Sequence, residues 1–225
     1  MTASAPVGDA IAKLAIRPPL QQRTREAWNR ILNAGVALLE EGGYEAFTIA
    51  AVCERANVAP RAVYDRVDDK DALFLAVYEH GISAIRADQA AFADDERWDG
   101  LHGGELARAV VREIAAIFTR HGAFLRRVVL LSGVHDEIHR RGSRYSRELG
   151  DDVTAVLLRE RDHIDHPDPE NAIRMAFNTV FSTLVVRTAH GPDFATPDTD
   201  QENFLDTLAT MTERYLFPQA TQTSP

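Results

Sequence analysis

The sequence has 225 residues, of which 45% are hydrophobic and 26% charged, and its net charge is −9 at neutral pH. This length suits one large globular domain or two small ones, and the single cysteine excludes an internal disulfide. No run reaches the ~20 apolar residues of a membrane span, and the first residues lack a signal-peptide pattern, so a cytoplasmic protein without membrane contact is predicted.

Apolar residues recur at helical spacing along most of the chain, and no stretch keeps the two-residue period of a strand for long. Glycines are predicted to break the pattern, notably at Gly122 and Gly142. Residues 94–104 are predicted to form a loop. Nine helices are expected, over about residues 24–41, 48–56, 60–67, 69–88, 105–121, 124–140, 143 or 146–161, 170–190 and 201–217.

The stretch from Thr48 to Leu73 predicts two short helices joined by a tight turn, followed by the start of a third helix. Thr48 can cap the first helix, because its hydroxyl can accept a hydrogen bond from a free N–H of the first turn. Asn57 tolerates the left-handed conformation that ends a helix. Pro60 has its φ already set for the start of the second helix.

The second short helix is chemically suited to the major groove of DNA. It buries Val63 and Val67, which leaves four residues as candidates to face outward: Arg61, Ala62, Tyr64 and Arg66. Arginine can contact guanine or phosphate, an alanine methyl can touch a thymine methyl, and a tyrosine hydroxyl can reach a phosphate.

In this register, the segment resembles the DNA-binding domain of TetR-family transcriptional regulators. Seven positions match the family pattern: Thr48, Ala56, Val58, Tyr64, Lys70, Ala72 and Leu73. Other positions depart from it: Val52, Cys53, Asn57, Ala59, Arg61, Ala62, Arg66 and Val67. The resemblance covers about residues 23–78. Because Arg61 and Ala62 lie where the family often reads bases, the operator sequence does not carry over.

The resemblance implies an all-α protein, with an N-terminal helix-turn-helix three-helix DNA-binding domain joined to a larger helical ligand-binding and dimerisation domain. The expected parts are a flexible arm (1–20), the DNA-binding domain (21–68), the larger helical domain (69–217) and a tail (218–225). The helix over 69–88 is expected to connect the two domains. The last two helices are apolar over wide faces and are expected to form a homodimer.

The predicted DNA contacts are Thr48, Arg61, Ala62, Tyr64, Arg66, Lys70, Arg23 and Arg25. Lys70 follows the predicted N-cap Asp69, and a helix N-terminus carrying a lysine attracts phosphate by its free N–H groups and by charge. Residues 1–80 hold nine Lys or Arg and eleven Asp or Glu, so most of the net negative charge lies further along the chain. That acidic remainder is expected to confine DNA contact to one basic face.

The larger domain is expected to enclose an apolar cavity for a small lipophilic effector. Its candidate lining residues are Trp98, Phe118, Leu125, Val129, Arg174, Phe177, Asn178 and Phe181. For any single apolar one of these, ordinary core packing is favoured over ligand contact. Arg174 and Asn178, one helical turn apart, either orient a ligand or face solvent.

The predicted function is therefore a regulator that binds double-stranded operator DNA as a homodimer, most simply a repressor released by its effector. A helical protein-interaction adaptor and a small all-α enzyme are the alternatives, but the sequence lacks the common phosphate-loop, nucleophile and metalloprotease motifs. His135 with His139, and His163 with His166, have chelating spacing, yet a structural site needs about four converging ligands. No metal, cofactor or enzymatic activity is predicted.

Overall fold

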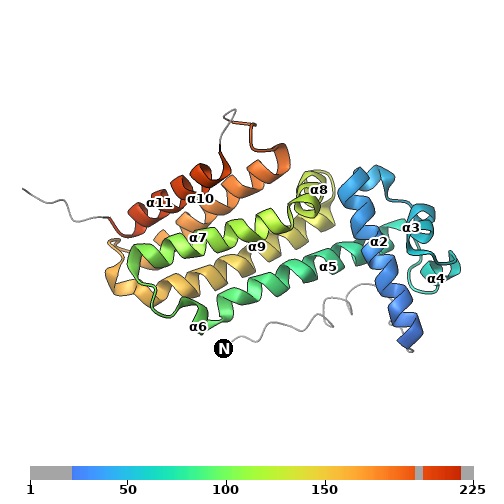
Figure 1. Cartoon of the computed structure of the whole chain (residues 1–225), viewed down its shortest axis with the longest axis horizontal. Coiled ribbons are helices and arrows are strands. Elements are labelled where there is room, and N and C mark those ends of the chain that lie inside the picture. The colour runs from blue at the N-terminus through green and yellow to red at the C-terminus, as the bar shows by residue number, and fades with distance from the viewer. Residues whose placement is uncertain (1–21, 196–199, 219–225) are drawn as a thin grey trace, which may run out of the picture. The chain divides into compact units, whose positions relative to one another are not determined.

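A computed structural model of the chain describes residues 22–195 and 200–218, except for the side chains of Gln22 and Arg23. In this part of the chain there are ten α-helices, two short 3-10 helices and no strand, which confirms the predicted all-α class (Figure 1). The predicted arm over 1–20 and all but the first residue of the predicted tail lie outside the described residues. The chain divides into two compact units, one up to Ala87 and one from Asp88 onward.

The first unit contains α2 (Gln22–Ala46), α3 (Ile49–Ala56), α4 (Arg61–Tyr64) and most of α5 (Lys70–Gln89). Helix α2 begins before Thr24 and is interrupted at Gly43, whose φ of 68° lies in the left-handed region that suits glycine. The predicted boundary at residue 68 differs from the division after Ala87. The difference arises because the first turns of α5 bury Leu73 and Phe74 completely and belong to the core of the first unit.

Close packing of α2 against α5 organises this core. A Cβ atom added to Gly35 would lie 2.4 Å from Cγ2 of Val77 and 3.2 Å from the Phe47 ring, so only glycine fits. The rings of Phe47 and Phe74 meet edge to face at 5.8 Å, and the Tyr44 ring meets Phe74 at 5.0 Å. These geometries are favoured by the charge distribution of aromatic rings.

The one cysteine lies in this unit. Cys53 is 4% exposed on the buried face of α3. Burial raises the pKa of its thiol, because the thiolate form loses hydration. Cys53 therefore behaves as a small hydrophobic residue and is held in its neutral form.

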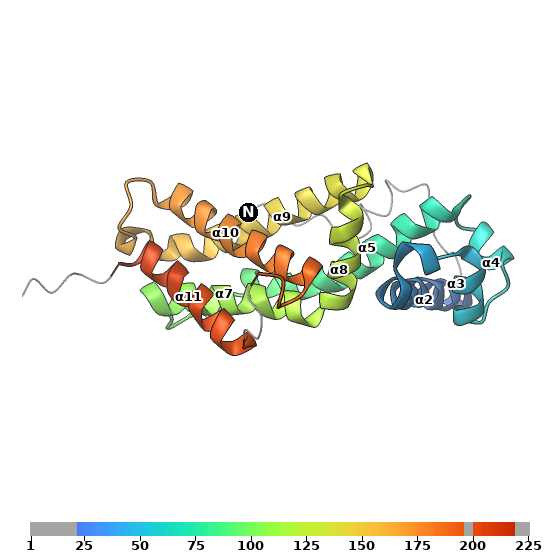
Figure 2. The same ribbon diagram turned by 90° about the horizontal axis from the view of Figure 1, so that it is seen from above.

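The second unit is a bundle of helices that follows the end of α5. Its α-helices are α6 (Asp95–Trp98), α7 (Gly103–Arg120), α8 (Gly122–Ser132), α9 (Asp136–Leu157), α10 (Pro169–His190) and α11 (Gln201–Leu216), with 3-10 helices η1 (Ala90–Ala93) and η2 (Leu158–His163). Helices α10 and α11 pack against each other, as do α7 and α11 (Figure 2). No helix within residues 22–195 and 200–218 is long and apolar enough to cross a membrane.

Two local predictions in this unit were wrong. The stretch over 94–104 contains the short helix α6, whose Trp98 is buried and donates from Nε1 to the Ala91 carbonyl at 3.2 Å. The break expected at Gly142 lies instead after Ser132, since α9 starts at Asp136 and runs through Gly142. His135 caps α9 by accepting from the Ile138 N–H, and acidic residues occupy its first turn, which favours a start there.

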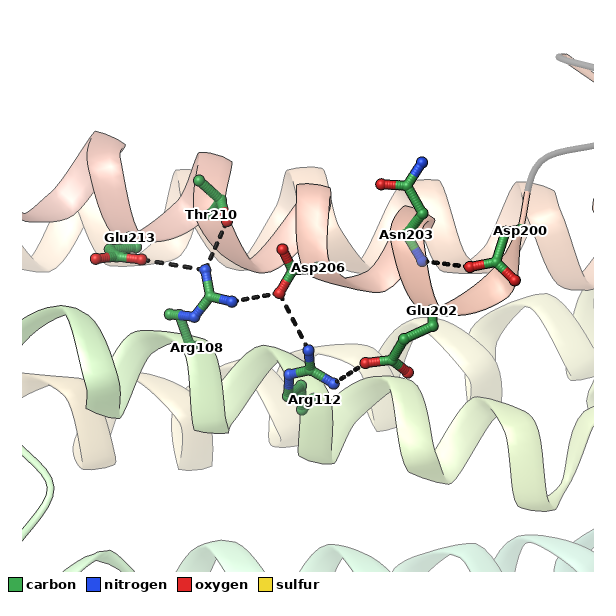
Figure 3. Close-up of polar contacts among 8 residues, drawn as sticks. All are labelled: Arg108, Arg112, Asp200, Glu202, Asn203, Asp206, Thr210 and Glu213. Carbon is green, nitrogen blue, oxygen red and sulfur yellow. Dashed lines mark hydrogen bonds and ion pairs between the residues drawn. The ribbon is translucent and has the colours of Figure 1, made fainter.

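An ion-pair network fastens α11 to α7 (Figure 3). Arg108 binds Asp206 and, at 3.3 Å, Glu213; Arg112 binds Glu202 at 2.8 Å and Asp206 at 3.2 Å. Isolated exposed pairs contribute little, but a shared network orders its members together. Because α11 buries only Leu208, Ala209, Thr212 and Leu216, these pairs supplement a small apolar contact.

We predict that Gly35→Ala destabilises the protein by about 1–3 kcal/mol, because the new methyl group overlaps the buried Val77 side chain. Gly142→Ala is the matched control. Nothing lies within 4 Å of a Cβ at Gly142 inside α9, so alanine there should raise stability by up to about 1 kcal/mol through helix propensity. Urea unfolding followed by circular dichroism measures both. Equal stability of Gly35→Ala and the unmodified protein would contradict the packing argument.

Candidate nucleic-acid interface

Capping interactions define both ends of α3. Thr48 Oγ1 accepts a hydrogen bond from the Ala51 N–H at 3.1 Å, which confirms the predicted N-cap. Asn57 has φ 52° and ψ 55°, the left-handed conformation predicted for the helix end. The following N–H, of Val58, bonds back to the Cys53 carbonyl at 3.0 Å. This 6→1 bond satisfies a carbonyl at the helix end and turns the chain sharply toward α4.

Helix α4 presents a short outward face. Pro60 starts it, and the Tyr64 N–H bonds to the Pro60 carbonyl at 3.1 Å. Val63 is fully buried and anchors the helix in the core. Arg61 and Tyr64, three residues apart, therefore share the outer side; the Arg61 side chain is 89% exposed and Tyr64 is 52% exposed. Ala62 is half-buried at the edge of this face.

Arg66 does not join that face. It is only 9% exposed, so the prediction that it points outward was wrong. The helical register explains the burial, because residue 66 is three positions after Val63 and follows it onto the inner side. In addition, α4 ends at Tyr64, and the Arg66 N–H bonds to the Val63 carbonyl at 2.8 Å as the chain turns inward. Its role as a DNA contact stays a prediction.

Lys70 begins α5 and is held by Tyr44. Asp69 caps the helix as predicted, its Oδ1 accepting from the Ala72 N–H at 2.8 Å. The Lys70 ammonium donates to the Tyr44 carbonyl at 3.2 Å and lies 3.9 Å from the centre of the Tyr44 ring. The Tyr44 hydroxyl donates to Asp71 Oδ1 at 2.6 Å. Tyr44 thus positions the lysine at the helix N-terminus, where phosphate binding is favoured.

The other basic residues of the first unit differ in whether their side chains are exposed or already paired. Arg25 is exposed on α2, and the side chain of the predicted contact Arg23 lies outside the described residues. Arg55 forms a two-pronged pair with Glu41, both contacts at 2.6 Å, and this pair lowers the pKa of the Glu41 carboxyl. The Arg55 guanidinium therefore links α3 to α2. On an otherwise acidic chain, the outer face of α4 presents an exposed arginine and an exposed tyrosine.

Comparison with known proteins agrees with this geometry. Residues 31–77 match the family model of bacterial regulatory proteins, tetR family. The chain carries a TetR-family DNA-binding domain. The matched segment contains α3, the turn and α4, and it ends within the part of α5 that packs on Gly35.

Two relatives of this chain are named HTH-type transcriptional repressor KstR. The protein from Mycolicibacterium smegmatis is 37% identical over 92 residues, 39% of this chain and 45% of the relative. That from Mycobacterium tuberculosis is 33% identical over 120 residues, 49% of this chain and 54% of the relative. The chain thus spans about half the length of the curated relatives it matches.

Solved TetR-like structures share the fold over most of the chain. A bacterial regulatory protein in the tetR family from Rhodococcus RHA1 has a TM-score of 0.63 at 16% identity, covering 86% of this chain and 98% of that one. Salmonella enterica GusR has a TM-score of 0.61 at 17% identity, covering 88% and 98%. At these identities the likeness shows the fold alone.

The residues predicted to line a ligand cavity fall into two groups. Phe118, Phe177 and Phe181 form one aromatic cluster, with ring centres 5.5 Å apart for Phe118 and Phe181 and 5.4 Å for Phe177 and Phe181. Trp98 and Leu125 are buried; Val129 is half-buried. Trp98, Phe118 and Leu125 belong to the core of the second unit, whereas Val129, Phe177 and Phe181 are only partly buried. Core packing accounts for all six as well as ligand contact does.

Arg174 and Asn178 lie on the exposed side of α10. Arg174 binds Asp151 at 2.8 Å and Glu170 at 3.1 Å. Of the two readings that the sequence left open for this pair, the structure supports the solvent-facing one and contradicts their placement in a cavity lining. The reason is helical register, since the buried residues of α10, such as Ile173 and Val180, lie on its other side.

His163 and His166, which have chelating spacing in the sequence, contact different partners in the structure. His163 bonds to the buried carboxylate of Glu160 at 3.1 Å, and His102 bonds to the same carboxylate at 3.1 Å. These contacts lower the pKa of the Glu160 carboxyl, with the His102 hydrogen bond the largest cause. His166 contacts the Tyr215 carbonyl at 3.2 Å. The sequence did not reveal the link from His102 to Glu160, because 58 residues separate them.

We predict that Tyr44 ionises with a pKa of about 12, raised chiefly by burial and then by its hydrogen bond to Asp71. The unfolded value is about 10. Because the folded state holds the proton more tightly, this stabilisation is complete below pH 10 and is lost as the pH rises toward 12. Ultraviolet titration at the tyrosinate absorption band, compared with Tyr44→Phe, measures it. Asp71→Asn should lower the pKa; an unshifted titration in that variant would contradict the assignment.

Proposed function

We propose that this chain is a transcriptional regulator that binds operator DNA through α4 as a homodimer, and that it represses until a small, largely apolar effector releases it. Three features support the proposal: the outer face of α4, the exposed apolar residues of the last two helices, and the aromatic cluster of the second unit. The first carries most weight, because it lies inside the segment that matches the TetR family model.

The outer face of α4 supplies the chemistry for groove recognition. Arg61 pairs with Asp65 only loosely, at 3.9 Å, and both side chains are exposed, so a phosphate or guanine competes for this guanidinium at little cost. Tyr64 exposes a large aromatic ring with a hydroxyl at its tip. We assign base or phosphate contacts to these two residues, with Lys70 and the capped start of α3 at Thr48 as phosphate contacts.

Helices α10 and α11 carry the surface proposed for dimerisation. Four of their large apolar residues are exposed in the single chain: Met175, Val186, Met211 and Tyr215. Exposed apolar side chains on two adjacent helices are typical of surfaces that pair with another protein. A twofold dimer would present two α4 helices to half-sites about 34–36 Å apart, or a multiple of that distance, on one side of the duplex.

Release by an effector requires that it bind the two states of the dimer unequally. A molecule held among aromatic residues such as Phe118, Phe177 and Phe181 would gain affinity from apolar burial. It lowers DNA affinity only if it prefers a geometry in which the half-site spacing no longer fits. A shift from mostly bound to mostly released requires a preference of about 10⁴-fold.

DNA binding is tested by selecting duplexes from a random-sequence pool with the purified protein and measuring affinity for the selected duplex by fluorescence anisotropy. We expect specific binding that weakens steeply as salt rises, because phosphate contacts release counterions. Tyr64→Ala and Arg61→Ala should each weaken binding to the selected duplex by about 1–3 kcal/mol. If Arg61 contacts phosphate, its variant also lowers the salt slope by about 0.9.

Arg161→Ala is the matched control, since Arg161 is an exposed arginine of η2 in the second unit. Its affinity should equal that of the unmodified protein. Unchanged binding by both α4 variants would refute the contact assignment. Failure to enrich any duplex, even at low salt, would refute DNA binding itself and favour a protein-interaction adaptor.

We predict that Met211→Glu shifts the protein from dimer to monomer, because a carboxylate at a paired apolar surface is buried without a partner. Light scattering after size-exclusion chromatography measures the mass of the particle. Val134→Glu is the control: Val134 is 84% exposed between α8 and α9, outside the two helices of the proposed interface. A Met211→Glu protein that remains dimeric at micromolar concentration would place the interface elsewhere.

A further inference from the structure

The last residue of α5, Gln89, is a buried amide whose hydrogen bonding is incomplete. It is 7% exposed, and its Nε2 donates to Asp152 Oδ2 on α9 at 2.6 Å. Its Oε1 is fully enclosed and has no hydrogen-bond partner among residues 22–195 and 200–218. Buried acceptors are almost always paired, because losing the hydrogen bonds of water is costly.

The orientation of this amide follows from its neighbour. An ionised carboxylate only accepts hydrogen bonds, so the nitrogen of Gln89 must face Asp152 and the oxygen must point away. Turning the amide round would bring two oxygens together and leave a buried N–H₂ group without its acceptor. Pairing with Asp152 therefore fixes the Gln89 oxygen on the side away from α9, where it can accept a hydrogen bond.

The site around Gln89 is held in place from several sides. The preceding residue, Asp88, bonds to His121 at 2.7 Å and Arg120 at 2.5 Å, which fastens the end of α5 to the end of α7. The following segment, η1, packs against α9 and buries Phe92, whose ring stacks on Trp98 at 5.6 Å. An acceptor held in this way loses little conformational freedom when it meets a donor.

The local charge favours a donor of neutral or positive charge. Asp152 is half-buried, and its carboxylate accepts from the enclosed Gln89 amide. An incoming hydroxyl or ammonium group can bond to the Gln89 oxygen and be attracted by the Asp152 carboxylate. An incoming carboxylate or phosphate would meet an acceptor and a negative charge, both unfavourable.

We propose that Gln89 and Asp152 form the polar anchor of an effector site, and that they select a largely apolar molecule carrying a hydroxyl or ammonium group. This inference rests on the proposed function, because it assigns recognition residues to the effector of that regulator. Within this proposal, we assign the apolar contacts to the aromatic cluster of the same unit, Phe118, Phe177 and Phe181. The amide of Gln89 and the carboxylate of Asp152 supply specificity, in the way that a small number of well-placed polar groups does in other ligand sites.

Three probes with one ring test the proposal: benzylamine, benzyl alcohol and toluene. Ligand-observed NMR titration of the full chain measures the dissociation constant of each. We expect both donor-bearing probes to bind at least tenfold more tightly than toluene. In Gln89→Met, which keeps the length of the side chain and removes its polar atoms, that preference should vanish while toluene binding remains.

Gln201→Met is the matched control, because Gln201 is an exposed glutamine of α11, and its preference should equal that of the unmodified protein. Thermal melting verifies that each variant is folded. If Gln89→Met does not fold, Asp152→Asn serves instead: removing the charge should reduce the preference for benzylamine over benzyl alcohol. Equal affinity for all three probes, no binding of any probe, or an unchanged preference in the variant used would overturn the inference.

The same protein preparations are tested for binding to the selected DNA without any probe. DNA binding with no donor preference would refute the polar anchor and leave the regulator intact. Donor preference without DNA binding would refute the proposed function and retain the site as a ligand site of another kind of protein.

Discussion

The contact of α2 with α5 at Gly35 is the constraint on which the DNA-binding unit depends. With no Cβ at this position, Val77 reaches the α2 backbone, and the rings of Phe47 and Phe74 close the space beside it. This contact sets the first turns of α5, where Lys70 lies. Helix α3 is tied to the same α2 by the pair between Arg55 and Glu41, and α4 follows α3 through one tight turn. The outer face of α4 is thus supported by the packing of α2, α3 and the first turns of α5.

Local features of this unit were readable from the sequence because they depend on neighbouring residues. The cap at Thr48, the left-handed Asn57 and the cap at Asp69 are all present. Arg66 was mispredicted although the signal was available: its spacing of three from Val63 puts it on the buried side. The break after Ser132 was missed because Gly142 was given more weight than the capping ability of His135. A glycine with open space around it tolerates a continuous helix, and that space is visible only in three dimensions.

In the second unit, the sequence identified which residues are apolar but not how they meet. Phe118 and Phe181 are 63 positions apart, and their contact depends on how α7 and α10 pack. Gln89 and Asp152 are also 63 positions apart, so no local pattern indicates that a buried amide meets a carboxylate. The polar residues singled out from sequence, Arg174 and Asn178, face solvent instead. Recognition groups in helical bundles are therefore harder to predict than the helices that carry them, because pairing between distant helices decides which polar atoms are enclosed.

The buried thiol of α3 has a practical consequence. Cys53 is the one cysteine in the chain, and its raised pKa and 4% exposure protect it from alkylating reagents while α3 is packed. A thiol reagent can modify it only when the helix-turn-helix opens, so the rate of labelling reports that opening free energy directly. Cys53 is thus a built-in probe of local unfolding in the first unit of the unmodified protein. Mass spectrometry can read it with DNA or small molecules present, without any engineered label.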